Sequence, residues 1–430
     1  MNTVARVNIW GMMVGAIAWR DETGYAVFEF DPDFIKKGVN LAPLKMPLEE
    51  ALNGRMIYSF PELNNTTFKG LPGMLVESLP DRFGNTIIDA WLARRGGEQN
   101  FNSVERLCYI GKRGMGALEF EPVIPLIDDV SESIQISELV NLTKEILNER
   151  KDLAVNIHDE TTDGLLKIIR VGTSAGGNRA KAIIAYNENT GDVRSGQIDG
   201  LKDYSYWIIK FDGINDKELG DPKGYCKIEY AYYLMATDCG IIMTECKTLN
   251  ENHRTHFMTK RFDRDGINKI HMQSLCSIAH FDFNLAGAYS YEQAFQIMRK
   301  LKLQYSDHEQ LYRRMVFNVI ARNQDDHTKN ISFLMDKAGK WGLSPAYDVT
   351  YAYNPDNIWL RSHQMSINGK RDDITGNDLI EVAENMNIKK PKEIIQIVLE
   401  TVSCWREYAK KANVNAEHQK KIYNALQLKI

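Results

Sequence analysis

Residues 323–330 read NQDDHTKN, and this octapeptide is the most informative part of the chain. It follows an amphipathic stretch that predicts a helix. Asp325 and Asn330 have the Asp-x-x-x-x-Asn spacing of kinase catalytic loops. In such a loop the carboxylate orients and deprotonates an acceptor hydroxyl, and the amide oxygen holds a metal ion against the phosphates. Lys329 could neutralise the phosphoryl group during transfer. Taken alone, the motif could also be a charged turn with a helix cap.

A second candidate metal ligand occurs in SPAYD at residues 344–348. A hairpin predicted over residues 331–343 precedes it, so we expect Asp348 at the end of a strand that returns beside the octapeptide. Kinases place a metal-binding aspartate there within Asp-Phe-Gly, whereas here Val349-Thr350 follows. An aspartate pair bracketing an asparagine is the minimal geometry for two Mg²⁺ ions, although a turn-capping aspartate is the alternative.

A glycine-rich segment, GTSAGGNRAK at residues 172–181, is predicted between two strands. Its small residues would let backbone N–H groups approach phosphates, and Lys181 adds positive charge. It has no Gly-Lys-Ser/Thr and is therefore not a Walker A loop; a structural hairpin loop would have a similar composition. Lys210, near the end of the apolar strand predicted over residues 206–211, either binds a nucleotide phosphate or extends its ammonium into solvent.

The order of these segments predicts an α+β chain with a two-lobed protein-kinase-like fold. The first 120 or so residues mix strand-like pieces with turns, and residues from about 165 to 265 alternate strands with a loop and a helix. After about residue 270 nearly all segments have helical periodicity. We expect an N-terminal subdomain at 1–125, a mixed α/β nucleotide-binding N-lobe at 126–263 and a mainly helical catalytic C-lobe at 264–430.

The composition is that of an ordinary globular protein. The 430 residues are 43% hydrophobic and carry a net charge of −4, which excludes a disordered chain and argues against a protein that coats nucleic acid. Six cysteines without a C-x-x-C pair indicate reduced thiols. The apolar residues 7–19 are better explained by a hairpin turning near Gly11 than by a signal peptide. We therefore expect a cytoplasmic protein that does not enter membranes.

Several motifs together resemble those of the HipA family, the serine/threonine kinase toxins of bacterial type II toxin–antitoxin modules. The motifs are LPG at 71–73, SLPDRFG at 78–84, GMGAL at 114–118, SAGG at 174–177, KRFDR at 260–264, DDHTKN at 325–330 and SPAYD at 344–348. The likeness extends from about residue 5 to the C-terminus. The chain is thus identified as a full-length member with the N-terminal subdomain.

The resemblance implies ATP and Mg²⁺ as cofactors. Asp325 would be the catalytic base, and Asn330 and Asp348 would be the Mg²⁺ ligands. Lys210 would bind the α/β-phosphates, the strand 260–262 would hold adenine through its backbone, and Asp263 would lie near the ribose. The residues expected to bind ATP are Ala175, Gly176, Gly177, Lys181, Lys210, Lys260, Phe262, Asp263, His327, Lys329 and Tyr347.

Regulation and partners also follow from the resemblance. Family members autophosphorylate a serine of the glycine-rich loop, which ejects the loop and inactivates the enzyme. Ser174 stands at that position, with Thr173 as a neighbouring candidate. A helix-turn-helix antitoxin, HipB-like, binds the toxin and operator DNA, so DNA affinity should come mainly from the antitoxin. Lys370-Arg371 is a candidate DNA contact, and a solvated turn is the alternative.

We therefore expect a growth-inhibiting, persistence-associated serine/threonine protein kinase. Family substrates include aminoacyl-tRNA synthetases, so a synthetase is one candidate substrate. Two other functions stay open: a small-molecule phosphotransferase of the aminoglycoside-kinase type, and a non-catalytic, nucleotide-sensing corepressor. The presence of Asp325, Asn330 and Asp348 argues against the corepressor, because a pseudokinase is free to lose them.

Overall fold

The computed structural model divides the chain into two compact units. The first consists of Met1–Leu41, Met46–Cys226 and Lys247–Met272, and the second of Ala42–Lys45, Lys227–Cys246 and Gln273–Ile430. The residues that the structure describes are 3–80, 84–85, 88–89, 101–123, 133–148, 180–198, 201–214 and 224–430. The glycine-rich loop residues Thr173, Ser174, Ala175, Gly176 and Gly177 lie outside them. The three-part division at residues 125 and 263 stays a prediction.

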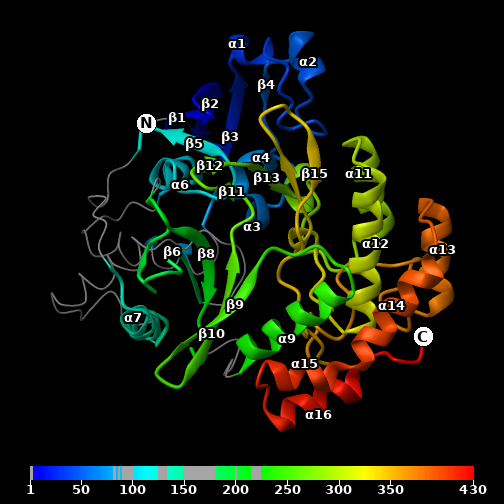
Figure 1. Ribbon diagram of the computed structural model, residues 1–430. Coiled ribbons are helices and arrows are strands. Elements are labelled where there is room, and N and C mark those ends of the chain that lie inside the picture. Colours follow the sequence, from blue (N-terminus) through cyan, green and yellow to red (C-terminus); the bar gives the residue numbers. More distant parts are fainter. Residues whose placement is uncertain are drawn as a thin grey trace. The chain divides into compact units, whose positions relative to one another are not determined.

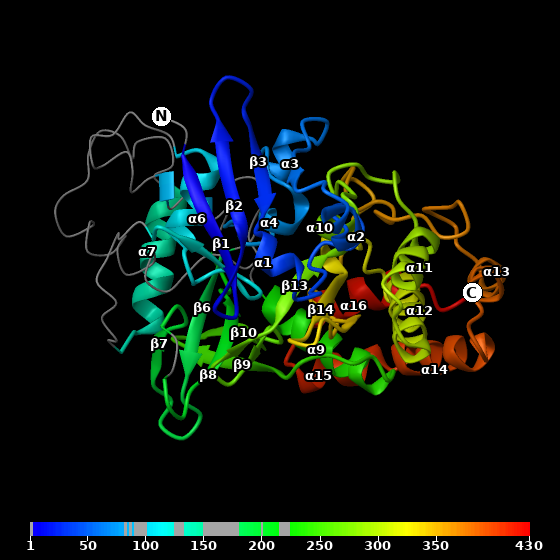
Figure 2. The same cartoon turned by 90° about the horizontal axis from the view of Figure 1, so that it is seen from above.

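The first unit begins with an antiparallel sheet of order β4–β3–β2–β1–β5, in which β1, β2 and β3 lie side by side (Figure 2). The expected hairpin is confirmed: β1 pairs with β2, and Trp10 and Gly11 have φ angles of 49° and 76°. Two consecutive positive φ angles are what a two-residue type I′ turn requires. The strands are β1 (Val4–Ile9), β2 (Met12–Arg20), β3 (Tyr25–Phe30), β4 (Ile57–Tyr58) and β5 (Leu118–Glu121).

Helices of the first unit cover this sheet and the next one. They are α1 (Pro32–Ile35), α2 (Leu48–Leu52), α3 (Asn65–Phe68), α4 (Gly73–Val76), α6 (Ser103–Ile110) and α7 (Ile136–Asn148). The helix α6 starts at a capping box, in which the Asn102 side chain accepts from the backbone of Glu105 and the Glu105 side chain accepts from the backbone of Asn102. The sequence predicts a polar connection and then an amphipathic helix over residues 128–150, and α7 confirms the helix.

A second antiparallel sheet has the order β7–β6–β8–β10–β9. One of its faces packs in a single hydrophobic cluster that includes Trp207, Met258 and the α7 residue Val140, each with no exposed surface. This burial fixes the sheet against α7, because removing apolar surface from water is the main stabilising contribution. The strands are β6 (Lys181–Tyr186), β7 (Val193–Ser195), β8 (Ser205–Lys210), β9 (Cys246–Glu251) and β10 (Arg254–Lys260).

Asp263, just after β10, is completely buried and joins two parts of the first unit that are far apart in sequence. Its carboxylate accepts from Arg261 (2.7 and 2.9 Å), from Arg264 Nη1 (2.8 Å) and from the backbone N–H of Gly116 (2.8 Å). Both arginines also donate to the carbonyl of Gly114. Burial opposes ionisation, but the two guanidinium groups hold the pKa of Asp263 well below its ordinary value. A small hairpin follows, β11 (Arg264–Asp265) and β12 (Asn268–Lys269).

The second unit is mainly helical, as expected, and α11 and α12 lie side by side in it (Figure 1). Its helices are α9 (Tyr225–Asp238), α10 (Leu275–Ala279), α11 (Tyr291–Lys300), α12 (Tyr305–Ile320), α13 (Gly376–Met386), α14 (Pro391–Ser403), α15 (Trp405–Lys411) and α16 (Ala416–Ala425). The predicted hairpin is present as β14 (Ser332–Met335) and β15 (Trp341–Leu343). With β13 (His271–Ser274), it forms a three-stranded sheet.

The helix α12 leads into the octapeptide. Leu311, Met315 and Val319 recur at helical spacing and have no exposed surface. At its C-terminal end the carbonyl of Ala321 accepts from Tyr232 Oη of α9 at 2.6 Å. Arg322 then takes a left-handed φ of 57°, which ends the helix and directs the chain into the loop.

Two details of the helical unit differ from expectation. The apolar i, i+3 and i+4 spacing of residues 391–408 predicts one helix, whereas the structure has two, α14 and α15, which meet at Cys404. The helix α13, which was not predicted, starts at a capping box between Thr375 and Asp378. All six cysteines lie among the described residues and none is in a disulfide bond. Within the described part of the chain no helix is both long enough and apolar enough to span a membrane.

We expect Asp263→Asn to lower the free energy of unfolding by about 3–5 kcal/mol, because two buried guanidinium groups would lose their counter-charge. Since folding lowers the pKa of Asp263, its contribution is complete at neutral pH and is lost only in acid. Urea denaturation at pH 7 measures the change. Asp192→Asn is the control, because Asp192 forms a partly exposed ion pair with Arg194. Equal losses in the two variants would contradict the role of Asp263.

Candidate active site

The octapeptide forms a loop that ends in the 3₁₀ turn η1 (Thr328–Asn330). The side chain of Thr328 anchors the turn by donating to the carbonyl of Phe281 at 2.7 Å. Asn330 Nδ2 donates to the carbonyl of Asp325 at 2.9 Å. The loop is therefore closed on itself, with the predicted base and the predicted metal ligand at its two ends.

The two adjacent aspartates of the loop have opposite surroundings. The Asp325 side chain is 48% exposed, whereas that of Asp326 is 2% exposed. Burial would raise the pKa of Asp326, but His363 beside it and the bonds from Gln364 and Tyr291 hold the pKa below its ordinary value. Asp325 is thus the aspartate that can meet an acceptor, and Asp326 is an internal anion.

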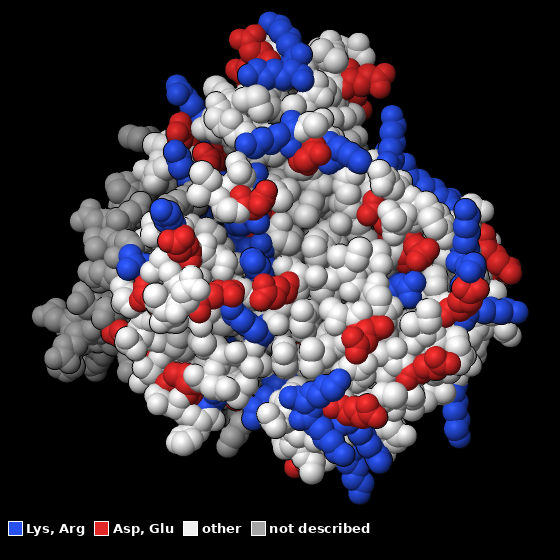
Figure 3. Space-filling view, viewed as in Figure 1, with Lys and Arg blue, Asp and Glu red and all other residues white. Residues whose placement is uncertain are grey.

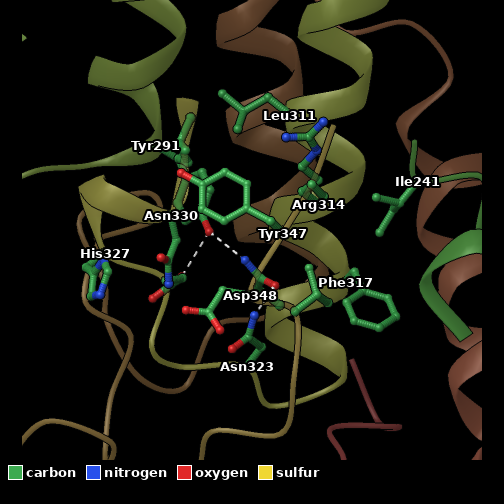
Figure 4. Close-up of a pocket in the computed structure, with 15 residues that line it drawn as sticks. Ile241, Tyr291, Leu311, Arg314, Phe317, Asn323, His327, Asn330, Tyr347 and Asp348 are labelled. Atoms are coloured by element: carbon green, nitrogen blue, oxygen red, sulfur yellow. Dashed lines mark hydrogen bonds between the residues drawn. The ribbon is translucent and has the colours of Figure 1, made fainter. Parts of the chain in front are cut away.

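Asp348 lines a cavity of about 30 Å³ together with Asn330 and His327 (Figure 4). Tyr347 Oη, next in the chain, donates to the carbonyl of Lys329 at 2.6 Å and lies 2.5 Å from Ser332 Oγ. The hydroxyl of Tyr347 therefore holds the Asp348 segment against the loop. The lining of the cavity thus includes both predicted metal ligands and the predicted phosphate-site residues His327 and Tyr347. Asp325 and Lys329 are joined to these residues through their backbone carbonyls.

The donor set of this cavity fits Mg²⁺. The bond from Asn330 Nδ2 to Asp325 leaves Oδ1 as the Asn330 ligand atom, and Asp348 supplies a carboxylate. Both are hard oxygen donors, and Mg²⁺ usually takes one or two protein carboxylates while phosphates and water complete its shell. Among the described residues there is no group of three or more His, Cys, Asp or Glu side chains placed to hold a metal ion alone.

Of the two basic side chains predicted for the phosphate site, His327 lies near the exposed aspartate and Lys329 lies over the ring of Phe283. His327 Nε2 lies 3.9 Å from Asp325 Oδ1. The ring of Phe283 lies 5.4 Å from the His327 ring, and Lys329 Nζ lies 5.4 Å from the centre of the Phe283 ring. Phe283 was not predicted from the sequence; it limits the positions open to both basic side chains.

Arg314 is a second residue that sequence reasoning missed. It lies on α12, is 7% exposed and lines the cavity. Its Nη2 donates to the carbonyl of Ser344 at 2.5 Å, at the start of the segment that carries Asp348. Burial lowers the pKa of Arg314 to about 10, so the guanidinium stays charged at neutral pH. An arginine in an amphipathic helix gives no signal that separates this role from an exposed one.

In the first unit, Lys181 and Lys210 are direct partners across β6 and β8, and Phe257 pairs with Lys210 on β10. Direct partners share a face of the sheet, so the two lysines lie on the same face. Lys260 pairs with Trp207 and lies on the opposite face, where its Nζ is 5.9 Å from the Trp207 ring. A backbone role for Lys260 agrees with this placement.

The structure gives Asp263 a role different from the expected ribose contact. Its four hydrogen bonds use both carboxylate oxygens, and no surface is left for a ligand. Its neighbour Phe262 is half-buried. The ribose contact was expected from the family resemblance, whereas the adjacent Arg261 and Arg264 are the partners that the structure shows.

Two protein-family sequence models match the chain. The HipA-like C-terminal domain matches residues 173–407, and the HipA N-terminal domain matches residues 5–121. The chain therefore belongs to the HipA family. Its fold is similar to that of HipA from Shewanella oneidensis MR-1, solved in complex with HipB and operator DNA. The TM-score is 0.65 at 15% identity, over 98% of this chain and 94% of that one.

A curated relative, the provisionally named kinase Y4mE of Sinorhizobium fredii, is 27% identical over 134 residues. The match takes in 28% of this chain and 31% of that protein. The chain therefore spans about a third of the length of this relative.

Asp348 has a φ of 55°, a left-handed conformation that aspartate and asparagine tolerate better than β-branched residues. We expect Asp348→Asn to leave the free energy of unfolding unchanged, and Asp348→Val to lower it by about 1–3 kcal/mol. Urea denaturation of the two variants separates backbone strain from loss of the carboxylate. Equal losses would show that the carboxylate, and not the backbone, determines stability here.

Proposed function

We propose that the chain is an ATP- and Mg²⁺-dependent serine/threonine protein kinase that acts as the growth-inhibiting toxin of a toxin–antitoxin pair. One observation carries the proposal: two oxygen ligands, Asn330 and Asp348, line one cavity, and Asn330 Nδ2 donates to the backbone carbonyl of Asp325, whose side chain is 48% exposed. Membership of the HipA family and the kinase name of the relative support it.

In the proposed reaction, Asp325 orients the acceptor hydroxyl and takes its proton as phosphate transfers. A positioned general base contributes typically 10²–10⁴-fold to the rate. Asn330 and Asp348 would hold Mg²⁺, which neutralises phosphate charge when it is bound. The Lys329 ammonium stabilises charge on the transferring group, and the loop supplies alignment because its two ends are bonded together.

Lys181 and Lys210 are proposed to bind the nucleotide phosphates. Two ammonium groups on directly opposite residues repel each other, so a bound anion would stabilise this pair of strands. Lys181 is only 4% exposed, and burial strengthens its interaction with a phosphate. Ala175, Gly176 and Gly177 would cover the nucleotide, and phosphorylation of Ser174 would switch the enzyme off.

A HipB-like antitoxin is the proposed partner, with operator DNA bound mainly through it. On the face that Figure 3 shows, basic and acidic side chains are largely interspersed. Lys370 Nζ lies 2.8 Å from the Asp378 carboxylate, and Arg371 Nε donates to the carbonyl of His363, so both candidate DNA contacts are engaged within the chain. An aminoacyl-tRNA synthetase is a candidate protein substrate, and we propose that the protein works in the cytoplasm.

Asp325→Ala should abolish transfer of the γ-phosphate to protein serine or threonine and should abolish growth inhibition. Asp356→Ala is the matched control, because Asp356 is an exposed aspartate of the same unit. Incorporation of labelled phosphate into the purified chain and into lysate proteins is measured for both variants. Unchanged incorporation in Asp325→Ala would refute the catalytic role. Transfer to sugars but not to proteins would identify a small-molecule phosphotransferase, and nucleotide binding without transfer would identify a corepressor.

Lys210→Met should weaken ATP binding about 10-fold or more, since a charge-assisted bond to phosphate is lost. Lys260→Met should change the affinity for ATP by no more than about twofold. The Lys260 side chain lies on the other face of the same sheet, and only its backbone is assigned to adenine. Calorimetric titration with ATP measures both. Equal losses in the two variants would contradict the assignment of the phosphates to the Lys210 face.

A further inference from the structure

The buried carboxylate of Asp326 is held by donors from two other segments of the second unit. Tyr291 Oη of α11 donates to Oδ2 at 3.0 Å, and His363 Nδ1 lies 2.8 Å from the same oxygen. The backbone N–H of Gln364 donates to Oδ1 at 2.8 Å. We call these four residues the Asp326 clasp. Each of them is less than 5% exposed.

The protonation of the clasp follows from its chemistry. A carboxylate can only accept, so Nδ1 of His363 carries the proton. His363 is itself fixed to Arg371. The backbone N–H of His363 donates to the carbonyl of Arg371 at 3.1 Å, and Arg371 Nε donates to the His363 carbonyl at 2.6 Å. The segment that supplies two of the donors is therefore held from its other side.

A hydrogen-bonded chain connects the clasp to the start of the loop. Asn323 Nδ2 donates to Asn318 Oδ1 at 2.9 Å, and Asn318 Nδ2 donates to Tyr291 Oη at 3.0 Å. The Tyr291 hydroxyl then donates to Asp326. The hydroxyl of Tyr291 is thus linked to the loop on both sides of Asp325. It bonds directly to Asp326, and it is connected to Asn323 through Asn318.

We propose that Asp326, His363 and Tyr291 are positioning residues for the phosphoryl transfer. They fix the backbone at Asp326 and thereby set where the neighbouring carboxylate of Asp325 meets the acceptor. This inference depends on the proposed kinase function. The donors lie on α11 and at residues 363–364, so a change in either segment reaches Asp326, the neighbour of the proposed base, through hydrogen bonds of 2.8–3.0 Å.

A merely structural role would give a different result from a positioning role. Tyr312 offers the comparison: it is also completely buried, and its hydroxyl donates to the carbonyl of Leu379 at 2.9 Å, away from the loop. Tyr291→Phe and Tyr312→Phe each remove one buried hydroxyl from the same unit. Stability should fall in both variants, whereas the rate of phosphate transfer should fall only in Tyr291→Phe.

We expect Tyr291→Phe to lower kcat about 10- to 100-fold with the KM for ATP unchanged, because a displaced base loses alignment but not nucleotide affinity. Tyr312→Phe should keep kcat within about twofold. Equal kcat values in the two variants would overturn the inference.

Substitutions of His363 give an independent test. The side-chain amide of asparagine can donate from nearly the position of Nδ1, so His363→Asn should keep most of the activity that His363→Ala loses. An alanine variant as active as the parent, or the same loss in both variants, would overturn the inference. If His363→Ala does not fold, the comparison of Tyr291→Phe with Tyr312→Phe still tests the inference.

Amide hydrogen exchange of residues 325–330 separates failure of this inference from failure of the proposed function. Exchange of the loop should accelerate in Tyr291→Phe and not in Tyr312→Phe, whether or not the parent chain transfers phosphate. A parent chain that transfers no phosphate would refute the proposed kinase function, but the hydrogen-exchange comparison would still test the clasp. Unchanged loop exchange in Tyr291→Phe would refute the clasp.

Discussion

The geometry of the loop at residues 323–330 depends on one buried anion, the carboxylate of Asp326. An ionised carboxylate without partners is very costly to bury, so it is found inside a protein only where donors surround it. Here Tyr291, His363 and Gln364 supply those donors from two segments outside the loop. The loop therefore has one favoured position, and in that position Asp325 faces outward.

The adjacent aspartates show how environment, and not residue type, assigns chemistry. Asp325 keeps half of its side-chain surface exposed and is the proposed base, whereas Asp326 is buried and serves as an anchor. Asp263 in the first unit uses the same device, since its buried carboxylate holds the backbone of Gly116 through arginine-supported hydrogen bonds. In both units a buried charge fixes a loop that hydrophobic packing alone would leave less defined.

Much of the fold could be predicted because it is encoded locally. The hairpin at Gly11 and the helix that leads into residue 323 follow from turn residues and from periodicity over short segments. Asp325 and Asn330 were predicted from their spacing and Asp348 from its place after a hairpin, and the structure places Asn330 and Asp348 in the lining of one cavity. The break at Cys404 could not be predicted, because the apolar pattern continues through it.

What the sequence did not reveal are contacts between distant residues. Tyr291 and His363 lie 35 and 37 residues from Asp326, and neither has a motif around it that signals a bond to the loop. Arg314 looks like any polar position of an amphipathic helix, although it supports the Asp348 segment. The resemblance implied a ribose contact for Asp263, and nothing in the sequence signalled that its carboxylate is bonded to Arg261 and Arg264 inside the first unit.

The most direct measurement is a crystal structure of the chain with Mg²⁺ and a non-hydrolysable ATP analogue. Our account predicts Mg²⁺ bound to Asn330 Oδ1 and the Asp348 carboxylate. It also predicts the γ-phosphate near Lys329 and the Asp325 carboxylate outside the metal shell. A metal ion held by other residues, or Asp325 bound directly to it, would contradict the account.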